Sequence, residues 1–154
     1  MNLDSFLKVG ETVTLGSHIF TAEEIKHFAA KYDPQPFHMD EEAARESVLG
    51  GLCASGWHTC TMWMRYNLAF LDSAVTWTGS GPRPEFGPSP GFSELKWLRP
   101  VYAGDTITFT RTILGHRPLA SRPGWRLVSQ KGGAFNSRGE AVLEFESAVL
   151  LKVV

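Results

Sequence analysis

The chain has 154 residues, enough for one compact domain with a hydrophobic core and too few for two ordinary domains. Hydrophobic residues make up 43% of it and charged residues 20%, which is ordinary for a soluble globular protein. The formal net charge of −1 argues against a protein that binds nucleic acid by releasing counterions. We therefore expect a single domain over residues 1–154, with no nucleic acid as partner.

The first residues and the cysteines indicate the compartment. The chain begins with neither a basic segment nor an apolar run, so we expect no secretory signal. No stretch reaches the roughly 18 apolar residues that a membrane span needs. Cys53 and Cys60 are too few for a disulfide framework and lack the spacing of a metal site. We expect a cytoplasmic protein that has no membrane partner and needs neither metal nor cofactor.

A helix is predicted to begin after Thr21. Thr21 and Glu24 have the spacing of a capping box, in which the hydroxyl accepts from the Glu24 amide and the carboxylate reaches back. The helix must end near Lys31, because Pro34 disfavours helical dihedrals at Asp33. Its apolar stripe consists of Ile25, Phe28, Ala29 and Tyr32.

The segment that follows, residues 33–38, carries the strongest candidates for chemistry. Asp33 and His38 are separated by a run with two prolines, which should hold the segment as a stiff, extended turn. A carboxylate and an imidazole held this way can share one water molecule and exchange protons with it. The alternative is a structural turn, in which the histidine bonds a backbone carbonyl. A short helix over residues 41–46, capped by Asp40, should come next.

A long central helix is predicted over residues 55–71, preceded by a glycine-rich entry. Large apolar side chains occur on nearly every face of it, so we expect burial almost all round. At its start, the amide of Gly56 lies at the positive end of the helix dipole.

The remainder of the chain is strand-like. A Gly/Pro-rich stretch, residues 79–91, is expected to lack regular structure and to form a lid or rim loop. Alternating apolar residues then predict about four strands, with a weaker one before the first helix. These strands cover residues 12–19, 92–98, 106–110, 125–130 and 143–151. One long helix with an antiparallel sheet makes the fold class α+β.

Residues 30–40 resemble the hydration motif of the MaoC-like, (R)-specific enoyl-CoA hydratases. Asp33, Pro36 and His38 match that motif at the correct offsets, and Gln35 stands where the family has asparagine. Two more segments match in the same order, residues 50–56 and residues 95–101 with 104–106. The resemblance implies a hot-dog fold, in which a curved antiparallel sheet wraps around a long central helix.

The resemblance also implies an activity and a site. A trans-2-enoyl-CoA thioester would be hydrated reversibly to the (R)-3-hydroxyacyl-CoA, with a water molecule held by Asp33 and His38. The Gly56 N–H would bind the thioester oxygen as negative charge develops there. Because an open sheet edge of this kind is usually covered by a second copy, we expect at least a homodimer.

Three alternatives remain open at this point. Hot-dog thioesterases commonly carry an acidic residue on the central helix, and residues 55–71 contain none, since Asp72 follows them. The same absence counts against an acyl-carrier-protein dehydratase, which pairs a loop histidine with a helix carboxylate. A non-catalytic acyl-CoA-binding subunit of a heteromeric dehydratase is the third.

Other side chains are assigned structural roles. His58 is expected to pack within the helix and His27 to lie on the surface. Aromatic residues are expected in the core and dimer contact, some of them beside an acyl tunnel; these are Trp57, Trp63, Tyr66, Phe70 and Trp97. Three basic residues are interpreted as solvated strand residues rather than coenzyme A phosphate ligands; these are Lys96, Arg99 and Arg111.

Overall fold

The computed structural model describes residues 1–74 and 76–154. The helices are α1 (Leu3–Leu7), α2 (Ala22–Tyr32), α3 (Pro36–Met39), α4 (Glu41–Glu46) and α5 (Gly56–Ala74). The strands are β1 (Thr12–Ile19), β2 (Glu85–Phe86), β3 (Gly91–Trp97), β4 (Thr106–Pro118), β5 (Trp125–Phe135) and β6 (Ala141–Lys152).

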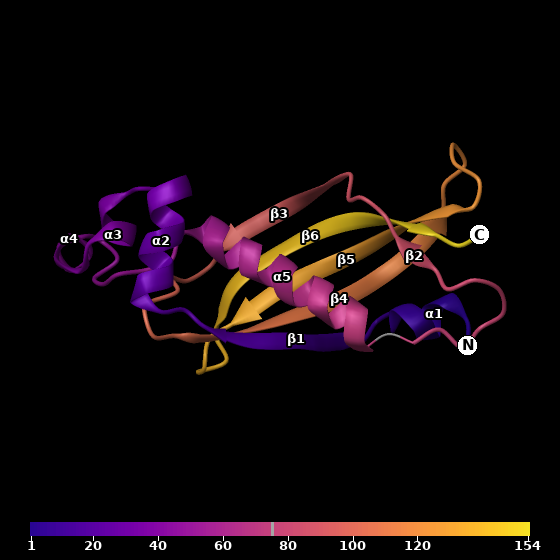
Figure 1. The fold of residues 1–154 in the computed structure, drawn as a ribbon, viewed down its shortest axis with the longest axis horizontal. Coiled ribbons are helices and arrows are strands. Elements are labelled where there is room, and N and C mark those ends of the chain that lie inside the picture. Colours follow the sequence, from indigo (N-terminus) through magenta and orange to yellow (C-terminus); the bar gives the residue numbers. More distant parts are fainter. Residues whose placement is uncertain (75) are drawn as a thin grey trace.

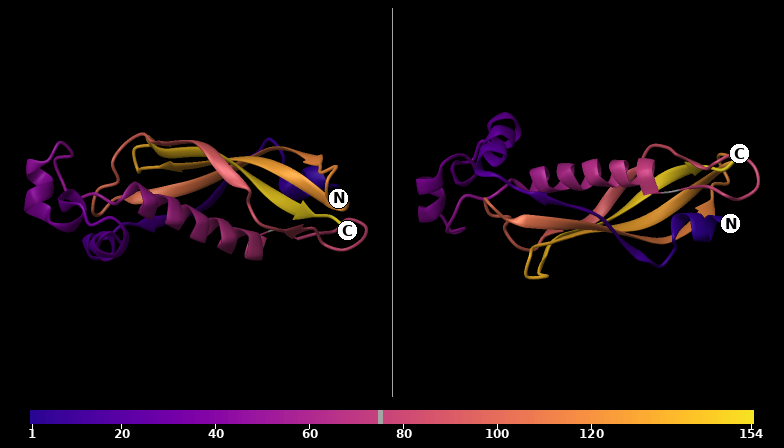
Figure 2. Two further views of the ribbon diagram at one scale, coloured as in Figure 1. Left: turned by 90° about the horizontal axis from the view of Figure 1, so that it is seen from above. Right: turned by 60° about the horizontal axis from the view of Figure 1, so that its bottom comes forward.

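One antiparallel sheet contains all six strands. Its order is β1-β4-β5-β6-β2, and β3 pairs with β6 alongside β2. The long strands β4, β5 and β6 curl around α5, which runs along the concave face (Figures 1 and 2). The α+β hot-dog fold that the sequence predicts is therefore confirmed.

The core divides into two clusters of buried side chains. The larger one lies between α5 and the sheet and includes Phe20, Trp63 and Phe109. The smaller one lies beneath α1 and includes Phe6 and Ile113. Helices α2, α3 and α4 gather at one end of the molecule, whereas α1 and both chain termini lie at the other (Figure 1).

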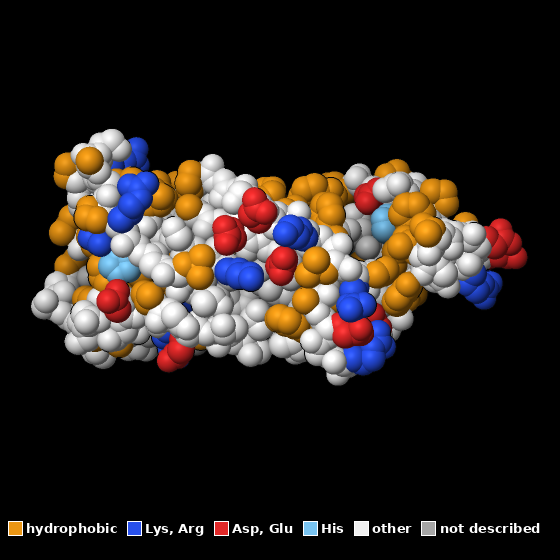
Figure 3. All heavy atoms as spheres, turned by 180° about the vertical axis from the view of Figure 1, so that it is seen from behind, with side chains coloured by type: hydrophobic (Ala, Val, Ile, Leu, Met, Phe, Trp, Pro, Cys, Tyr) orange, Lys and Arg blue, Asp and Glu red, His pale blue; other side chains and the backbone are white. Residues whose placement is uncertain are grey.

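The outer face of the sheet is polar. Acidic and basic side chains are interspersed on the face turned away from α5 (Figure 3). Hydroxyl groups pair between neighbouring strands, Thr12 with Thr112 at 2.7 Å and Ser17 with Thr108 at 2.8 Å. The period of two therefore separates a solvated face from a buried one.

Two sequence-based expectations need correction. Helix α5 is not buried all round, because Trp57, Met64 and Leu68 are 49%, 45% and 56% exposed. The Gly/Pro-rich stretch is not wholly irregular, since β2 pairs antiparallel with β6 at the sheet edge. Among residues 1–74 and 76–154, no helix has both the length and the hydropathy to cross a lipid bilayer.

Candidate active site

Asp33 lies at the C-terminal end of helix α2. Its N-cap is Thr21, whose hydroxyl accepts a hydrogen bond from the Glu24 amide at 3.2 Å, as the capping box predicts. Asp33 is the C-cap residue, with φ −156° and ψ 66°, and its N–H donates to the Ala29 carbonyl. The helix ends there because Pro34 disfavours helical dihedrals at Asp33.

His38 lies in a short helix rather than in an extended turn. Residues 36–39 form α3, in which Pro36 occupies the first turn. Proline is favoured there because its φ suits a helix and its missing N–H would have no partner. The expectation of an extended segment up to His38 is therefore wrong over its second half. The short helix α4 then follows, and the Asp40 carboxylate caps it by accepting from the Ala43 amide at 2.8 Å.

The two nitrogens of the His38 ring have different surroundings. Nδ1–H donates to the Cys53 carbonyl at 2.6 Å, and this bond leaves Nε2 unprotonated in the neutral ring. Nε2 lies 3.4 Å from Oδ2 of Asp33. The His38 side chain is 8% exposed and that of Asp33 is 18% exposed. A partly sheltered carboxylate therefore faces an imidazole of fixed orientation.

The surroundings of Asp33 favour its charged form. Burial raises the pKa of the carboxyl, but the hydrogen bond from Gln35, the Ser55 hydroxyl and the charge of His38 lower it by more. The pKa of Asp33 therefore lies below its usual 3.8. Gln35 Nε2 donates to Oδ1 of Asp33 at 2.6 Å.

Ser55 is a site residue that the sequence did not single out. It is fully buried, and its hydroxyl has no hydrogen bond of good geometry among the described residues. It nevertheless lowers the pKa of Asp33, so the hydroxyl lies close to that carboxylate. The available signal was its place directly before Gly56, where family members often carry histidine.

Gly56 begins α5 beside His38. The segment leading into the helix is fixed by backbone bonds, from Cys53 N to the Phe37 carbonyl at 3.3 Å and from Ala54 N to the Val101 carbonyl at 2.8 Å. A pocket of about 270 Å³ is lined by both His38 and Gly56, whereas Asp33 lies behind His38 and is not among its lining residues; we call it the dyad pocket after His38. The structure thus brings the imidazole and the helix N-terminus to one cavity.

Trp97 of β3 packs directly on Gly56. A β-carbon at position 56 would lie 2.3 Å from Cε2 of that ring, so only glycine allows the close approach. Trp97 also lines the dyad pocket and contacts Trp57 edge to face, with ring centroids 5.0 Å apart.

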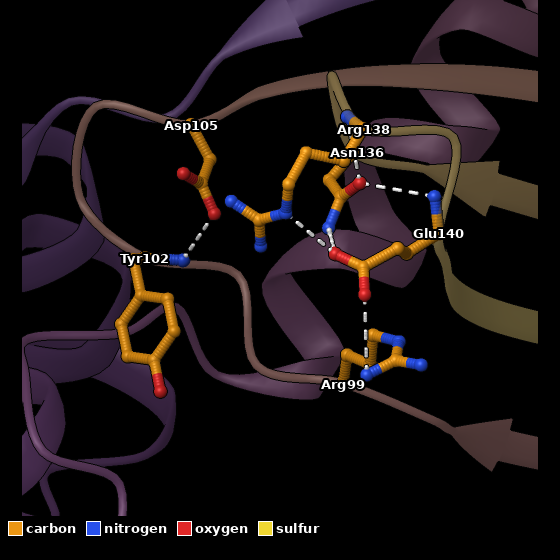
Figure 4. A network of polar contacts seen from close by, with 6 residues as sticks. All are labelled: Arg99, Tyr102, Asp105, Asn136, Arg138 and Glu140. Atoms are coloured by element: carbon orange, nitrogen blue, oxygen red, sulfur yellow. Dashed lines mark hydrogen bonds and ion pairs between the residues drawn. The ribbon is translucent and has the colours of Figure 1, made fainter.

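Arg99 lines one wall of the dyad pocket, and a network of polar contacts stabilises this wall (Figure 4). Glu140 accepts from Arg138 Nε at 2.7 Å and from Asn136 Nδ2 at 3.0 Å, and it pairs with Arg99 at 3.4 Å. Asp105 accepts from the Tyr102 amide at 2.9 Å. These contacts tie the β3–β4 connection to the β5–β6 hairpin.

A second, largely apolar cavity of about 330 Å³ lies between α5 and the sheet; we call it the apolar cavity. Trp57, Met64, Phe86 and Phe145 are among its lining residues. Phe86 comes from the Gly/Pro-rich stretch, so part of that stretch walls this cavity. Trp57 lines this cavity and Trp97 lines the dyad pocket, so one ring of the contacting pair belongs to each wall.

Several other residues considered from the sequence do not line the dyad pocket. His58 stacks on Phe28 with ring centroids 4.7 Å apart, and burial lowers its pKa to about 4, so it packs as a neutral ring. His27 is exposed. Arg111 is only 4% exposed, which corrects its interpretation as a solvated strand residue. Helix α5 extends to Ala74 and so includes Asp72, but that residue lies roughly 24 Å along the helix from Gly56.

The fold places the chain among hot-dog proteins, and its similarity to known proteins places it in the hydratase and dehydratase class. The MaoC like domain family matches residues 8–123, and the chain belongs to that family. A MaoC-like dehydratase from Rhodospirillum rubrum is 36% identical in sequence, with a TM-score of 0.80 over 100% of this chain and 98% of that one.

Two further proteins extend the comparison. The (R)-hydratase from A. caviae involved in PHA biosynthesis is 21% identical and shares the fold, with a TM-score of 0.67 over 95% of this chain and 96% of that one. The uncharacterized protein YdeM of Bacillus subtilis (strain 168) is 25% identical over 156 residues, 99% of each chain.

Proposed function

We propose that the protein reversibly hydrates trans-2-enoyl-CoA thioesters to (R)-3-hydroxyacyl-CoA. One observation carries the proposal. His38 has its Nδ1 fixed by a backbone carbonyl and turns Nε2 toward Asp33 at 3.4 Å, in the pocket that Gly56 also lines. The (R) configuration rests on membership of the family rather than on this geometry.

The reaction needs a water molecule held between two groups that can exchange protons. A water bonded to Asp33 Oδ2 and His38 Nε2 attacks the β-carbon, and one of the two side chains accepts its proton. A proton returns to the α-carbon, which completes the addition of water across the double bond. Asp33 is ionised at neutral pH, because the net effect of its surroundings is a lowered pKa.

Gly56 supports the same step from the other side of the pocket. The first amides of α5 have no acceptor within the helix and lie at the positive end of its dipole. The Gly56 N–H donates to the thioester oxygen as negative charge develops there during attack. The Trp97 ring lies against Gly56 at this end of the pocket.

The working enzyme is proposed to be a homodimer. Apolar side chains of α5 and β3 are exposed in the single chain, among them Met64, Leu68 and Phe92. Within the described residues β3 pairs with β6 alone, so its other edge is open. A second copy that pairs at β3 would cover both the edge and the apolar side chains.

The test is a hydration assay with crotonyl-CoA, following loss of the conjugated absorbance. Asp33→Asn and His38→Ala should each lower kcat by about 10²–10⁴-fold, the usual worth of general acid–base catalysis. His27→Ala, which removes an exposed histidine of α2, is the matched control and should leave kcat unchanged. Circular dichroism must establish that each variant is folded.

The alternatives give different readouts in the same experiment. A thioesterase would release free coenzyme A thiol, whereas a non-catalytic subunit would bind the thioester and convert none of it. Near-native rates in folded Asp33→Asn and His38→Ala variants would refute the assignment of the pair.

A further inference from the structure

Arg111 occupies a position that the strand pattern reserves for an apolar side chain. Along β4 the buried residues alternate as Ile107, Phe109, Arg111 and Ile113, with exposed fractions of 0%, 0%, 4% and 1%. This face of the sheet packs against α5, so the arginine projects into the interior from a central strand. A long cationic side chain is rarely buried to this extent without a specific partner.

The partners of Arg111 do not balance its charge. Nη1 donates to the neutral Asn67 side chain at 3.1 Å, and the guanidinium lies over the Phe70 ring at 5.4 Å. Nε is buried without an acceptor among the described residues. No carboxylate in that part of the chain forms an ion pair with Arg111. Burial lowers its pKa to about 10, which still leaves the group charged at neutral pH.

The unbalanced charge faces a cavity. Arg111, Asn67, Gln130 and Ser147 form the polar part of the wall of the apolar cavity. Gln130 already donates to the Ser147 hydroxyl at 3.0 Å, so these two polar side chains partly satisfy each other. Arg111 is the charged member of this group, and its Nε–H has no acceptor among the described residues.

This polar wall lies away from the reacting end of the proposed substrate. Asn67 follows Gly56 by eleven residues on α5, about 16 Å along the helix axis. Trp57 lines the apolar cavity and Trp97 lines the dyad pocket, and the two rings contact each other. An acyl chain that runs from Gly56 past this ring pair and along α5 would meet the apolar cavity and Arg111.

We propose that the apolar cavity binds the far end of the acyl chain, and that Arg111 there binds a terminal carboxylate. The inference rests on the proposed hydratase function and names its substrate class, monothioesters of unsaturated dicarboxylic acids. A carboxylate would give Nε an acceptor and neutralise the guanidinium in a site with little water. A chain ending in a methyl group would reach the same cavity and leave the charge unpaired.

The experiment compares two series of trans-2-enoyl-CoA substrates at several chain lengths, one ending in carboxylate and one in methyl. The native enzyme should favour the carboxylate series in kcat/KM by at least about tenfold at the best length. Arg111→Met keeps the side-chain length and removes the charge, so it should reverse the preference. Arg65→Met, at an exposed arginine of α5, is the control and should retain it.

Asn67→Asp provides an independent variant should Arg111→Met fail to fold. It would place a carboxylate beside Arg111 Nη1, satisfy the charge internally, and abolish the preference for the carboxylate series. A native enzyme that hydrates both series equally, or favours the methyl series, would overturn the inference and leave the proposed function standing.

If neither series is hydrated, the proposed function fails and the site is judged by binding instead. Calorimetric titration with the saturated carboxylate-ended acyl-CoA should then show at least about tenfold weaker binding to Arg111→Met than to the native chain. Equal affinities would overturn the proposal for Arg111.

Discussion

Among single residues, His38 combines two roles that the sequence presents as alternatives. One is a structural histidine bonded to a backbone carbonyl, and the other is a catalytic histidine paired with Asp33. The ring does both, because Nδ1 bonds the Cys53 carbonyl while Nε2 remains available to Asp33. The structural bond serves the proposed chemistry, since it fixes the tautomer and the direction of Nε2.

The lowered pKa of Asp33 leads to a prediction about pH. Since the ionised carboxylate is required, the acidic limb that Asp33 contributes to kcat/KM should lie below the usual carboxyl pKa of 3.8. Gln35→Met removes a hydrogen bond that favours the charged form while burial continues to disfavour it. The acidic limb of the profile should therefore move to higher pH in Gln35→Met.

The measurement is kcat/KM against pH for the native enzyme, Gln35→Met and Asp72→Asn. Asp72 is an exposed carboxylate at the far end of α5, so its variant should follow the native profile. Coincident native and Gln35→Met curves would mean that Asp33 does not control the acidic limb.

Asp33, His38 and Gly56 could be proposed from the sequence because they lie in local motifs, and the structure brings His38 close to Asp33 and into one pocket with Gly56. Arg111 is buried, contrary to the sequence-based expectation, although the sequence carries a signal for its burial. The strand was expected to end at residue 110, whereas the alternation of Ile107 and Phe109 continues through Arg111 to a buried Ile113. Ser55 offered less, because its effect depends on how close the fold brings it to Asp33.

Among the secondary-structure elements, β3 packs so closely on α5 that position 56 must be glycine. Gly56→Ala would push a methyl group into the Trp97 ring, so it should lower stability by about 1–3 kcal/mol and reduce turnover. Trp97→Leu alone should be tolerated better, because that ring is 45% exposed. The double variant should recover stability, since the smaller side chain makes room for the methyl group.

Urea denaturation of all four proteins gives the coupling energy between the two positions. Additive effects would mean that the two side chains do not compete for the same space. Gly51→Ala is a suitable control, because its β-carbon would make only ordinary contact with Tyr102 at 3.4 Å.

The elements that begin at a recognisable cap were predictable. Helices α2 and α4 have such caps, and the structure places them, and also strand β1, close to the expected residues. Helix α1 and strand β2 are five and two residues long, too short for a period to show. They are held by contacts distant in sequence, α1 by the smaller core cluster and β2 by β6.

At the scale of the whole molecule, the open edge of β3 predicts self-association. Phe92→Asp places a charge on an exposed apolar residue of that strand, so it should shift the protein from dimer toward monomer. Val48→Asp introduces the same charge at a fully exposed valine outside β3 and should leave the mass unchanged. Light scattering after gel filtration measures the mass directly. A native protein that is monomeric at all concentrations would contradict the proposed dimer.

The indole rings of Trp57 and Trp97 also provide an intrinsic fluorescence signal for ligand binding. Trp57 and Trp97 are each about half exposed and contact each other, and Trp57 lines the apolar cavity whereas Trp97 lines the dyad pocket. A molecule entering either cavity must change the polarity around at least one of these rings. Emission from this pair would therefore report occupancy without a label, and replacing each ring by phenylalanine would separate the signal of one cavity from that of the other.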